Sequence, residues 1–297
     1  MPLGGVWAPS GYAGFFARDE SRYDPMSLSS SDFQHSDSNV RHFRDPARFL
    51  ETLDTVSFLW LLTLIAAAAA LYSSVGHGGA SGYLAAMAFF GLAPATMKPA
   101  ALVMNIVVAG LGFARLYRAG YFRWNLFWPF ALGSVPLAVL GGAWKLHDHV
   151  YQYLVGAALL VAAARLLWES REPPTREPPR LEVALPTGAG LGFVSGLTGV
   201  GGGIFLSPLL LLLRWADMRT TAAVSAAFIL VNSIAGLTGL LLSHTALPAK
   251  LPLMVLVALA GAVIGTELAV RRLAPIRLRK LLGVVLIVAA IKMLATA

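Results

Sequence analysis

A glycine-rich stretch, GVGGGIFLSP, occupies positions 199–208 inside a long apolar segment. A related stretch, GHGGASGYL, occupies positions 76–84, and Gly79 and Gly202 are 123 positions apart. Such glycine runs interrupt a helix and free backbone N–H and C=O groups, which lipid cannot satisfy, so protein, water or a ligand has to satisfy them. The two breaks therefore predict a chain built from two membrane-embedded halves of similar plan.

The composition agrees with a chain that lipid solvates. Of the 297 residues, 57% are apolar and 13% are charged, and that charged share is about half the usual value for a soluble domain. Several apolar runs approach the roughly 20 residues that span a bilayer core. These runs are Thr55–Tyr72, Met97–Phe113, Trp124–Trp144, Val150–Leu167, Leu185–Leu213, Ala222–Leu242, Leu251–Ala269 and Leu281–Leu294. We therefore expect an all-α polytopic membrane protein with about seven to nine transmembrane segments, which include glycine-broken helices or hairpins.

Two polar segments divide the chain. Residues 1–51 are polar and contain few aliphatic side chains, so we expect a disordered tail. Positions 171–180 read REPPTREPPR, in which the proline pairs block helix formation and favour a stiff extended linker. The predicted organisation is a tail over 1–51, a first membrane repeat over 52–169, a linker over 170–184 and a second membrane repeat over 185–297.

Charge and polar residues predict how the two repeats are oriented. Asn105 and Asn232 lie 127 positions apart in similar apolar contexts. Three arginines follow the span of Asn105, whereas only Lys250 follows the span of Asn232, and the bias reverses in the next loop of each half. Opposite bias in equivalent loops predicts inverted repeats. Each broken region then enters and leaves on one face, as a hairpin or as two half-helices; segments 185–195 and 204–213 are short enough for half-helices.

The breaks are the best candidates for a binding site. Successive N–H groups in a glycine turn bind anions, and the start of a helix adds a positive dipole end. Breaks from inverted repeats converge near the membrane midplane, where transporter sites lie. The candidate substrate-binding residues are the break glycines and the polar residues near them: Gly76, His77, Gly78, Gly79, Ser81, Asn105, Ser195, Thr198, Gly199, Gly201, Gly202, Gly203 and Asn232.

Each candidate also has a purely structural interpretation. The glycines would allow close helix packing, the hydroxyls would bond their own helix backbone, and the asparagines would hold the broken backbone. His77 would either bind the anion or carry a coupling proton, or it would bond nearby carbonyls. Outside the breaks, Lys98 at the entrance of a span would either steer anions or, as we rather expect, extend to the interface. Glu267 is expected to pair with Arg271 on the same helix face.

Several classes of protein are excluded or disfavoured. Positive charges lie between the apolar runs, and no basic face carries interleaved aromatic residues, so no nucleic-acid partner is expected. The chain has no cysteine, which excludes disulfides and thiolate metal sites. GxSxG, HExxH and P-loop motifs are absent from the sequence. We therefore predict neither an enzyme nor a self-contained ATP-driven pump, with no cofactor and no metal.

The chain resembles the TauE/SafE family of membrane proteins, the sulfite exporter or toluenesulfonate uptake permease group. The resemblance covers about Thr55–Leu294 and is carried by GVGGGIFLSP, by positions 76–84 and by the paired asparagines. The first half departs from the fuller pattern, since Ala80 stands where Gly203 stands in the second half and His77 replaces Val200.

The resemblance implies a multi-pass transporter of sulfite, sulfonates or related sulfur-containing anions in a cytoplasmic membrane of bacterial type. Its partners would be the bilayer, the small anion and a proton as coupling ion. Two alternatives stay open on the sequence. One is a transporter of another cargo, such as an organic acid or a metal cation, and the other is a non-transporting scaffold whose tail and linker are the working parts.

Overall fold

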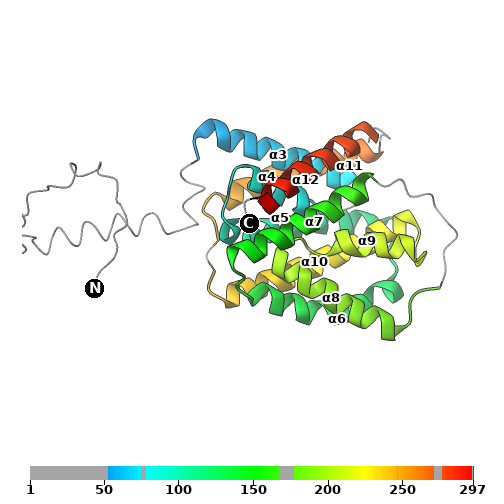
Figure 1. Cartoon of the computed structure of the whole chain (residues 1–297). Coiled ribbons are helices and arrows are strands. Elements are labelled where there is room, and N and C mark those ends of the chain that lie inside the picture. The colour runs from blue at the N-terminus through cyan, green and yellow to red at the C-terminus, as the bar shows by residue number, and fades with distance from the viewer. Residues whose placement is uncertain (1–52, 75–77, 168–176, 246, 271–275, 296) are drawn as a thin grey trace, which may run out of the picture. The chain divides into compact units, whose positions relative to one another are not determined.

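The computed structural model describes residues 53–74, 78–167, 177–245, 247–270, 276–295 and 297. The described residues form ten α-helices and no strand, which confirms the all-helical class. The helices are α3 Thr55–Ser74, α4 Ala80–Phe89, α5 Pro94–Arg118, α6 Trp124–Ala143, α7 Asp148–Leu167, α8 Leu181–Thr198, α9 Gly203–Leu212, α10 Met218–Leu242, α11 Leu251–Val270 and α12 Ile276–Ala295 (Figure 1). The predicted disorder of the tail concerns residues outside this described part.

Four of the described helices are long and apolar enough to cross a membrane: α3, α5, α6 and α10. The two helices that follow the glycine breaks, α4 and α9, have only 10 residues each. Exposed tryptophans bracket α6, since Trp124 begins it and Trp144 follows its last residue. The 20 residues of α6 span about 30 Å, the thickness of a bilayer hydrocarbon core, and tryptophans gather at its two interfaces.

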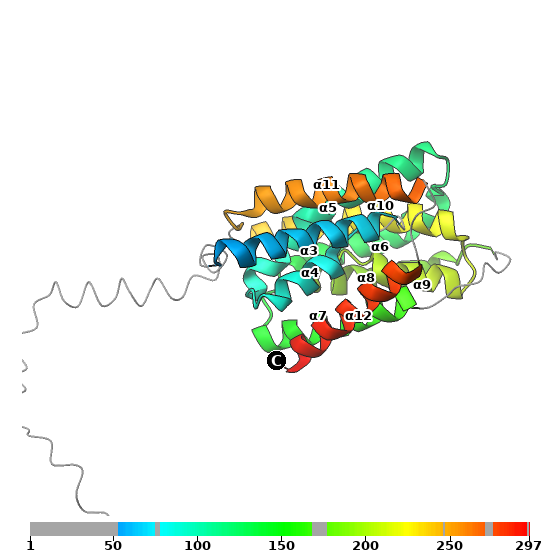
Figure 2. The same cartoon turned by 90° about the horizontal axis from the view of Figure 1, so that it is seen from above.

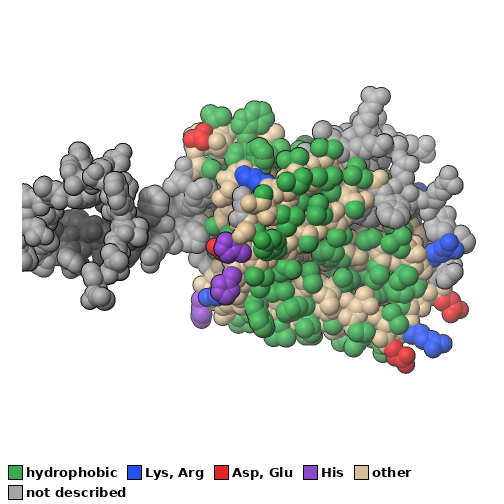
Figure 3. All heavy atoms as spheres, in the orientation of Figure 1, with side chains coloured by type: hydrophobic (Ala, Val, Ile, Leu, Met, Phe, Trp, Pro, Cys, Tyr) green, Lys and Arg blue, Asp and Glu red, His purple; other side chains and the backbone are tan. Residues whose placement is uncertain are grey.

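The helix bundle has two distinct ends. At one end, a common pocket is lined by the first residues of α5 and α7 and by the last residues of α6, α8 and α10. We call this the pocket end. At the other, the arginine end, Arg123 before α6 lies near Pro178 before α8 and Trp215 before α10. Arg118 ends α5 and Arg219 begins α10 at this same end. Figure 3 shows apolar side chains across the middle of the unit and charged ones at its two ends.

Each glycine-broken region returns to the end from which it starts. The first region starts at the pocket end, because Lys250, just before α11, lies over the ring of Phe58 in α3. It also returns there, since α4 ends at Phe89, five residues before Pro94. The second region starts near Pro178 and ends at Leu212, both at the arginine end. The two hairpins therefore start from opposite ends of the bundle.

One length prediction for the second hairpin is wrong. Segment 185–195 was expected to be a short half-helix, but α8 runs from Leu181 to Thr198 and has 18 residues. Pro186 is the sixth residue of α8 and lies inside the helix, where proline removes one intrahelical hydrogen bond, yet the helix begins at Leu181. The four residues Leu181–Ala184, which the sequence assigned to the linker, are helical.

Small residues bring the hairpins close to the other helices. A Cβ on Gly133 of α6 would overlap the carbonyl oxygen of Leu185 in α8, and one on Gly261 of α11 would overlap that of Ala66 in α3. Figure 2 shows α3 lying along α11. Gly133 and Gly261 therefore serve close packing, because membrane helices approach closely where small residues line the interface.

Candidate functional site

The second break is a left-handed glycine turn between α8 and α9. Gly199, Gly201 and Gly202 have φ values of 78°, 84° and 75°. L-residues with a side chain rarely adopt this region, so the turn depends on glycine. Gly202 is the N-cap of α9, and it provides no side chain to cap the first amides of that helix. The break therefore presents backbone N–H groups at a positive helix end.

Asn105 joins the two breaks. It is fully buried at the middle of α5, and its Nδ2 donates a hydrogen bond of 3.3 Å to the carbonyl of Val200. A Cβ on Gly201 would lie 2.9 Å from Asn105 Nδ2, and a Cβ on Gly78 would lie 2.9 Å from Asn105 Oδ1. Ile229 of α10 lies against the same two glycines. The two breaks thus meet on either side of a single amide.

Buried oxygen atoms without a hydrogen-bond partner gather at this meeting point. Within the described part of the chain, they include Asn105 Oδ1, Ser195 Oγ and Ser233 Oγ. A Cβ on Gly201 would lie 3.1 Å from Ser233 Oγ, and one on Gly202 would lie 3.2 Å from the Cβ of Ser195. Each unsatisfied buried group costs about 1–3 kcal/mol. Several together indicate a site that water or a polar ligand completes.

Comparisons with known proteins identify the family of the chain. The sequence matches the family described as "Sulfite exporter TauE/SafE" over residues 61–293, which includes both breaks. The chain belongs to this family. It is also 40% identical over 228 residues to "Probable membrane transporter protein y4hK" of Sinorhizobium fredii, a match that covers 75% of this chain and 92% of the relative. No solved structure matches the chain.

The other predicted residues of this TauE/SafE protein have mixed environments. Thr198 donates to the carbonyl of Val194 in its own helix, and Asn232 Nδ2 donates to that of Phe228, at 2.8 Å each. Asn232 Oδ1 is buried without a partner in the described structure. The hydroxyl of Ser81 donates to the phenol oxygen of Tyr72 instead of to its own helix. Gly76 and His77 lie outside the described residues.

Sequence reasoning missed two side chains at the break. Ser233 directly follows Asn232, and Ile229 lies one helical turn before it, so all three belong to α10. Nothing in the sequence separates Ser233 from other hydroxyls in apolar helices, because its role depends on the approach of Gly201 from another helix. The spacing of Ile229 and Ser233, four residues apart, would have placed them on one helix face.

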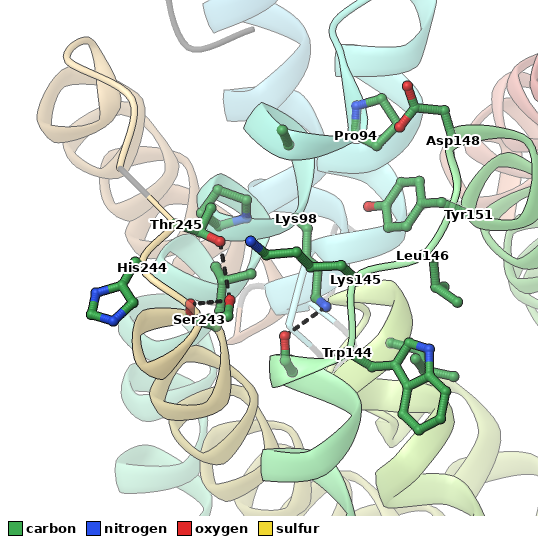
Figure 4. Close-up of a pocket in the computed structure, with 15 residues that line it drawn as sticks. Pro94, Lys98, Trp144, Lys145, Leu146, Asp148, Tyr151, Ser243, His244 and Thr245 are labelled. Carbon is green, nitrogen blue, oxygen red and sulfur yellow. Dashed lines mark hydrogen bonds between the residues drawn. The ribbon is translucent and has the colours of Figure 1, made fainter. Parts of the chain in front are cut away.

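The pocket at the pocket end lies next to the second break. Its volume is about 320 Å³, against about 30 Å³ for one water molecule in the liquid. Lys98, Gly142 and Leu197 belong to its lining, together with Lys145, Asp148 and Tyr151 among others (Figure 4). A Cβ on Gly199 would lie 3.3 Å from Cγ of Lys98. One lysine stem therefore separates the pocket from the glycine turn.

Lys98 does not extend to the interface, contrary to the sequence-based expectation. It is 7% exposed, and its Nζ donates to the carbonyls of Gly141 and Gly142 at 3.1 and 3.0 Å. These carbonyls lie in the last turn of α6, where they lack intrahelical donors, and the ammonium satisfies them. Glu267 forms an ion pair with Arg115 of α5, in which Oε1 and Nη2 are 3.9 Å apart. Its expected partner, Arg271, lies outside the described residues.

Proposed function

We propose that this protein is a secondary transporter of small oxyanions, with sulfite, sulfonates or related sulfur-containing anions as cargo. The observation that carries the proposal is the meeting of two glycine breaks at Asn105, with orphaned buried oxygens around them. Backbone amides at the start of α9 and the hydroxyls of Ser195 and Ser233 would donate to the anion. The family description supplies the sulfur-containing cargo.

We further propose that the halves are inverted repeats. Helices α3 to α7 have 20, 10, 25, 20 and 20 residues, and α8 to α12 have 18, 10, 25, 20 and 20. Equivalent pairs also pack alike, since α6 packs on α8 as α11 packs on α3, and the two hairpins start from opposite ends. Such a plan supports alternating access, in which one half rocks against the other around a fixed site.

The arginine end would face the cytoplasm. The arginines whose side chains the structure describes lie near this end, at positions 115, 118, 123, 180, 214 and 219. Basic residues in short loops are retained on the inner side of a membrane. The pocket would then open outward from a cytoplasmic membrane of bacterial type, which fits the bacterial source of the relative.

Asn105 also bears on the coupling ion. Its Nδ2 faces the Val200 carbonyl, so its Oδ1, an acceptor, faces the break at Gly78. An acceptor suits a water molecule or a protonated oxygen better than a bare anion oxygen. Together with His77 in the first break, this supports a proton that travels with the anion.

The proposal is tested by flux into proteoliposomes. We expect radiolabelled sulfite or 4-methylbenzenesulfonate to enter vesicles that contain the protein, and entry to change when a proton gradient is imposed. Gly202→Leu should abolish flux, because leucine cannot adopt the turn and would overlap Phe228. Removal of residues 1–51 is the control and should leave flux intact.

Each outcome separates the proposal from its alternatives. If organic acids or metal cations enter the vesicles and sulfur anions do not, the cargo proposed here is wrong. If no solute crosses while deletion of the tail or linker abolishes binding of another protein, the scaffold interpretation holds.

A further inference from the structure

We propose that the pocket is an anion-binding vestibule and that the buried ammonium of Lys98 sets its charge preference. This inference deepens the proposed function and rests on it, because it names the residue that draws an oxyanion toward the second break. The pocket is separate from the meeting point at Asn105, although it shares a wall with Gly199.

The first argument is charge. Lys98 Nζ bonds two neutral carbonyls, and no carboxylate within the described residues forms an ion pair with it. The last carbonyls of α6 carry only about half of a negative charge through the helix dipole. A buried charge without a full counter-ion is costly, so an anion in the pocket would stabilise it.

The second argument is the lining. Lys145 adds another, exposed positive charge on the wall. The hydroxyls of Tyr151 and Ser243 donate to the carbonyls of Thr198 and Leu240. Asp148 is the one carboxylate of the lining, and its side chain is exposed. In Figure 4 its carboxylate lies beside Pro94, away from the ammonium of Lys98. The deep part of the pocket therefore carries positive charge, while its negative charge lies in solvent, where it is screened.

The third argument is position. Lys98 lies in the first turns of α5, and Asn105 lies two turns further along the same helix. An anion at Lys98 would be next to the glycine turn, and a short movement past the lysine stem would bring it to the α9 amides. Low-dielectric walls of one charge sign concentrate ions of the opposite sign. The vestibule would select anions before they reach the break.

The test uses the absence of native cysteine, since a single introduced cysteine is then a unique reporter. Ser243→Cys places a thiol in the pocket lining with little change of size. The detergent-solubilised full chain is treated with an anionic sulfonatoethyl and a cationic trimethylammonioethyl methanethiosulfonate. We expect faster modification by the anionic reagent, and Lys98→Gln should lower the ratio of the two rates about fivefold or more.

Two variants keep the test independent of folding. Lys98→Gln keeps an N–H donor for the Gly141 and Gly142 carbonyls while it removes the charge, and Lys98→Arg should retain the anionic preference. Ala249→Cys, on an exposed loop outside the pocket lining, is the matched reporter. Its rate ratio should not change with Lys98→Gln. Thermal unfolding of each variant checks that the fold is kept.

The outcomes distinguish this inference from the proposed function. A rate ratio at Ser243→Cys that is the same in wild-type and Lys98→Gln backgrounds overturns the inference, even if sulfite flux is present. A ratio that falls with Lys98→Gln supports it, even if no sulfur anion is transported, because the reagents report charge and not cargo. Protection of Ser243→Cys by 4-methylbenzenesulfonate, which does not react with the reagents, supports both if it is lost in Lys98→Gln.

Discussion

The two breaks need glycine for different physical reasons. In the second, Gly199, Gly201 and Gly202 adopt the left-handed conformation, so the backbone itself demands glycine. In the first, Gly79 has a φ of −107°, which any residue adopts, and glycine is needed for space. A Cβ on Gly79 would overlap the ring of Tyr83, and one on Gly78 would press on Asn105. The duplicated motif therefore forms a left-handed turn in the second break and allows a close side-chain contact in the first.

Alanine substitution should expose this difference most strongly. Gly201→Ala forces a side chain into the left-handed region, which costs about 1–2 kcal/mol, and its Cβ would lie 2.8 Å from Ile229. Gly78→Ala meets mainly the movable amide of Asn105. We expect Gly201→Ala to lower sulfite flux and the unfolding temperature more than Gly78→Ala does. Equal losses would show that the breaks are equivalent.

The two asparagines should also differ. Asn105 holds the carbonyl of Val200 across the halves, whereas Asn232 bonds its own helix. Asn105→Ala leaves the Val200 carbonyl unsatisfied, at about 1–3 kcal/mol. Asn232→Ala leaves the Phe228 carbonyl with its helical bond. In detergent, the unfolding temperature of Asn105→Ala should be well below that of Asn232→Ala. The reverse order would contradict the role given to Asn105.

The two serines on either side of the second break should have different roles, one in anion binding and the other in stability. Ser195 Oγ is buried without a partner in the described structure, whereas Ser207 Oγ forms hydrogen bonds with the Gly203 carbonyl and with the Ser225 hydroxyl, at 2.8 Å each. Ser195→Ala should leave stability nearly unchanged and weaken sulfite binding by about tenfold, the effect of roughly 1.4 kcal/mol. Ser207→Ala should lower stability by about 1 kcal/mol with little effect on affinity. Calorimetric binding and thermal unfolding of both variants decide between these roles.

The smallest expected effect concerns how α5 and α10 begin. Asp217 caps α10 through the amides of Arg219 and Thr220, whereas Ala93 gives α5 no side-chain cap. Partial burial raises the pKa of Asp217, but hydrogen bonds from Thr220 and Arg219 outweigh it and hold the pKa below its ordinary 3.8. Because the folded-state pKa is depressed, the contribution of the carboxylate is complete at neutral pH and is lost as the pH falls below 3.8.

Asp217→Ala should therefore lower the stability at pH 7 by about 1 kcal/mol. Its unfolding temperature should converge with that of wild type in acid. A difference between the two proteins that stays constant down to pH 3 would contradict the capping role.

Much of the plan could be predicted from the sequence, since span-length apolar runs and two glycine motifs are local signals. The charge bias between loops predicts inverted repeats, which stays a prediction. Contacts between distant helices had no such signal. Asn105 holding Val200, 95 residues away, and Lys98 reaching Gly141, 43 residues away, depend on how helices pack. The start of α8 at Leu181 could not be predicted, because it directly follows the proline-rich segment 171–180, which favours extended backbone.

The central claim is that two unequal breaks form one site, and counting bound sulfite tests it most directly. Equilibrium binding of radiolabelled sulfite to the purified Lys98→Gln chain, in which the buried charge of the vestibule is removed, should give one site per chain, and the glycine substitutions are made in this background. Gly201→Ala should remove that site and Gly78→Ala should weaken it. Two sites per chain, with one left intact by each substitution, would contradict the account.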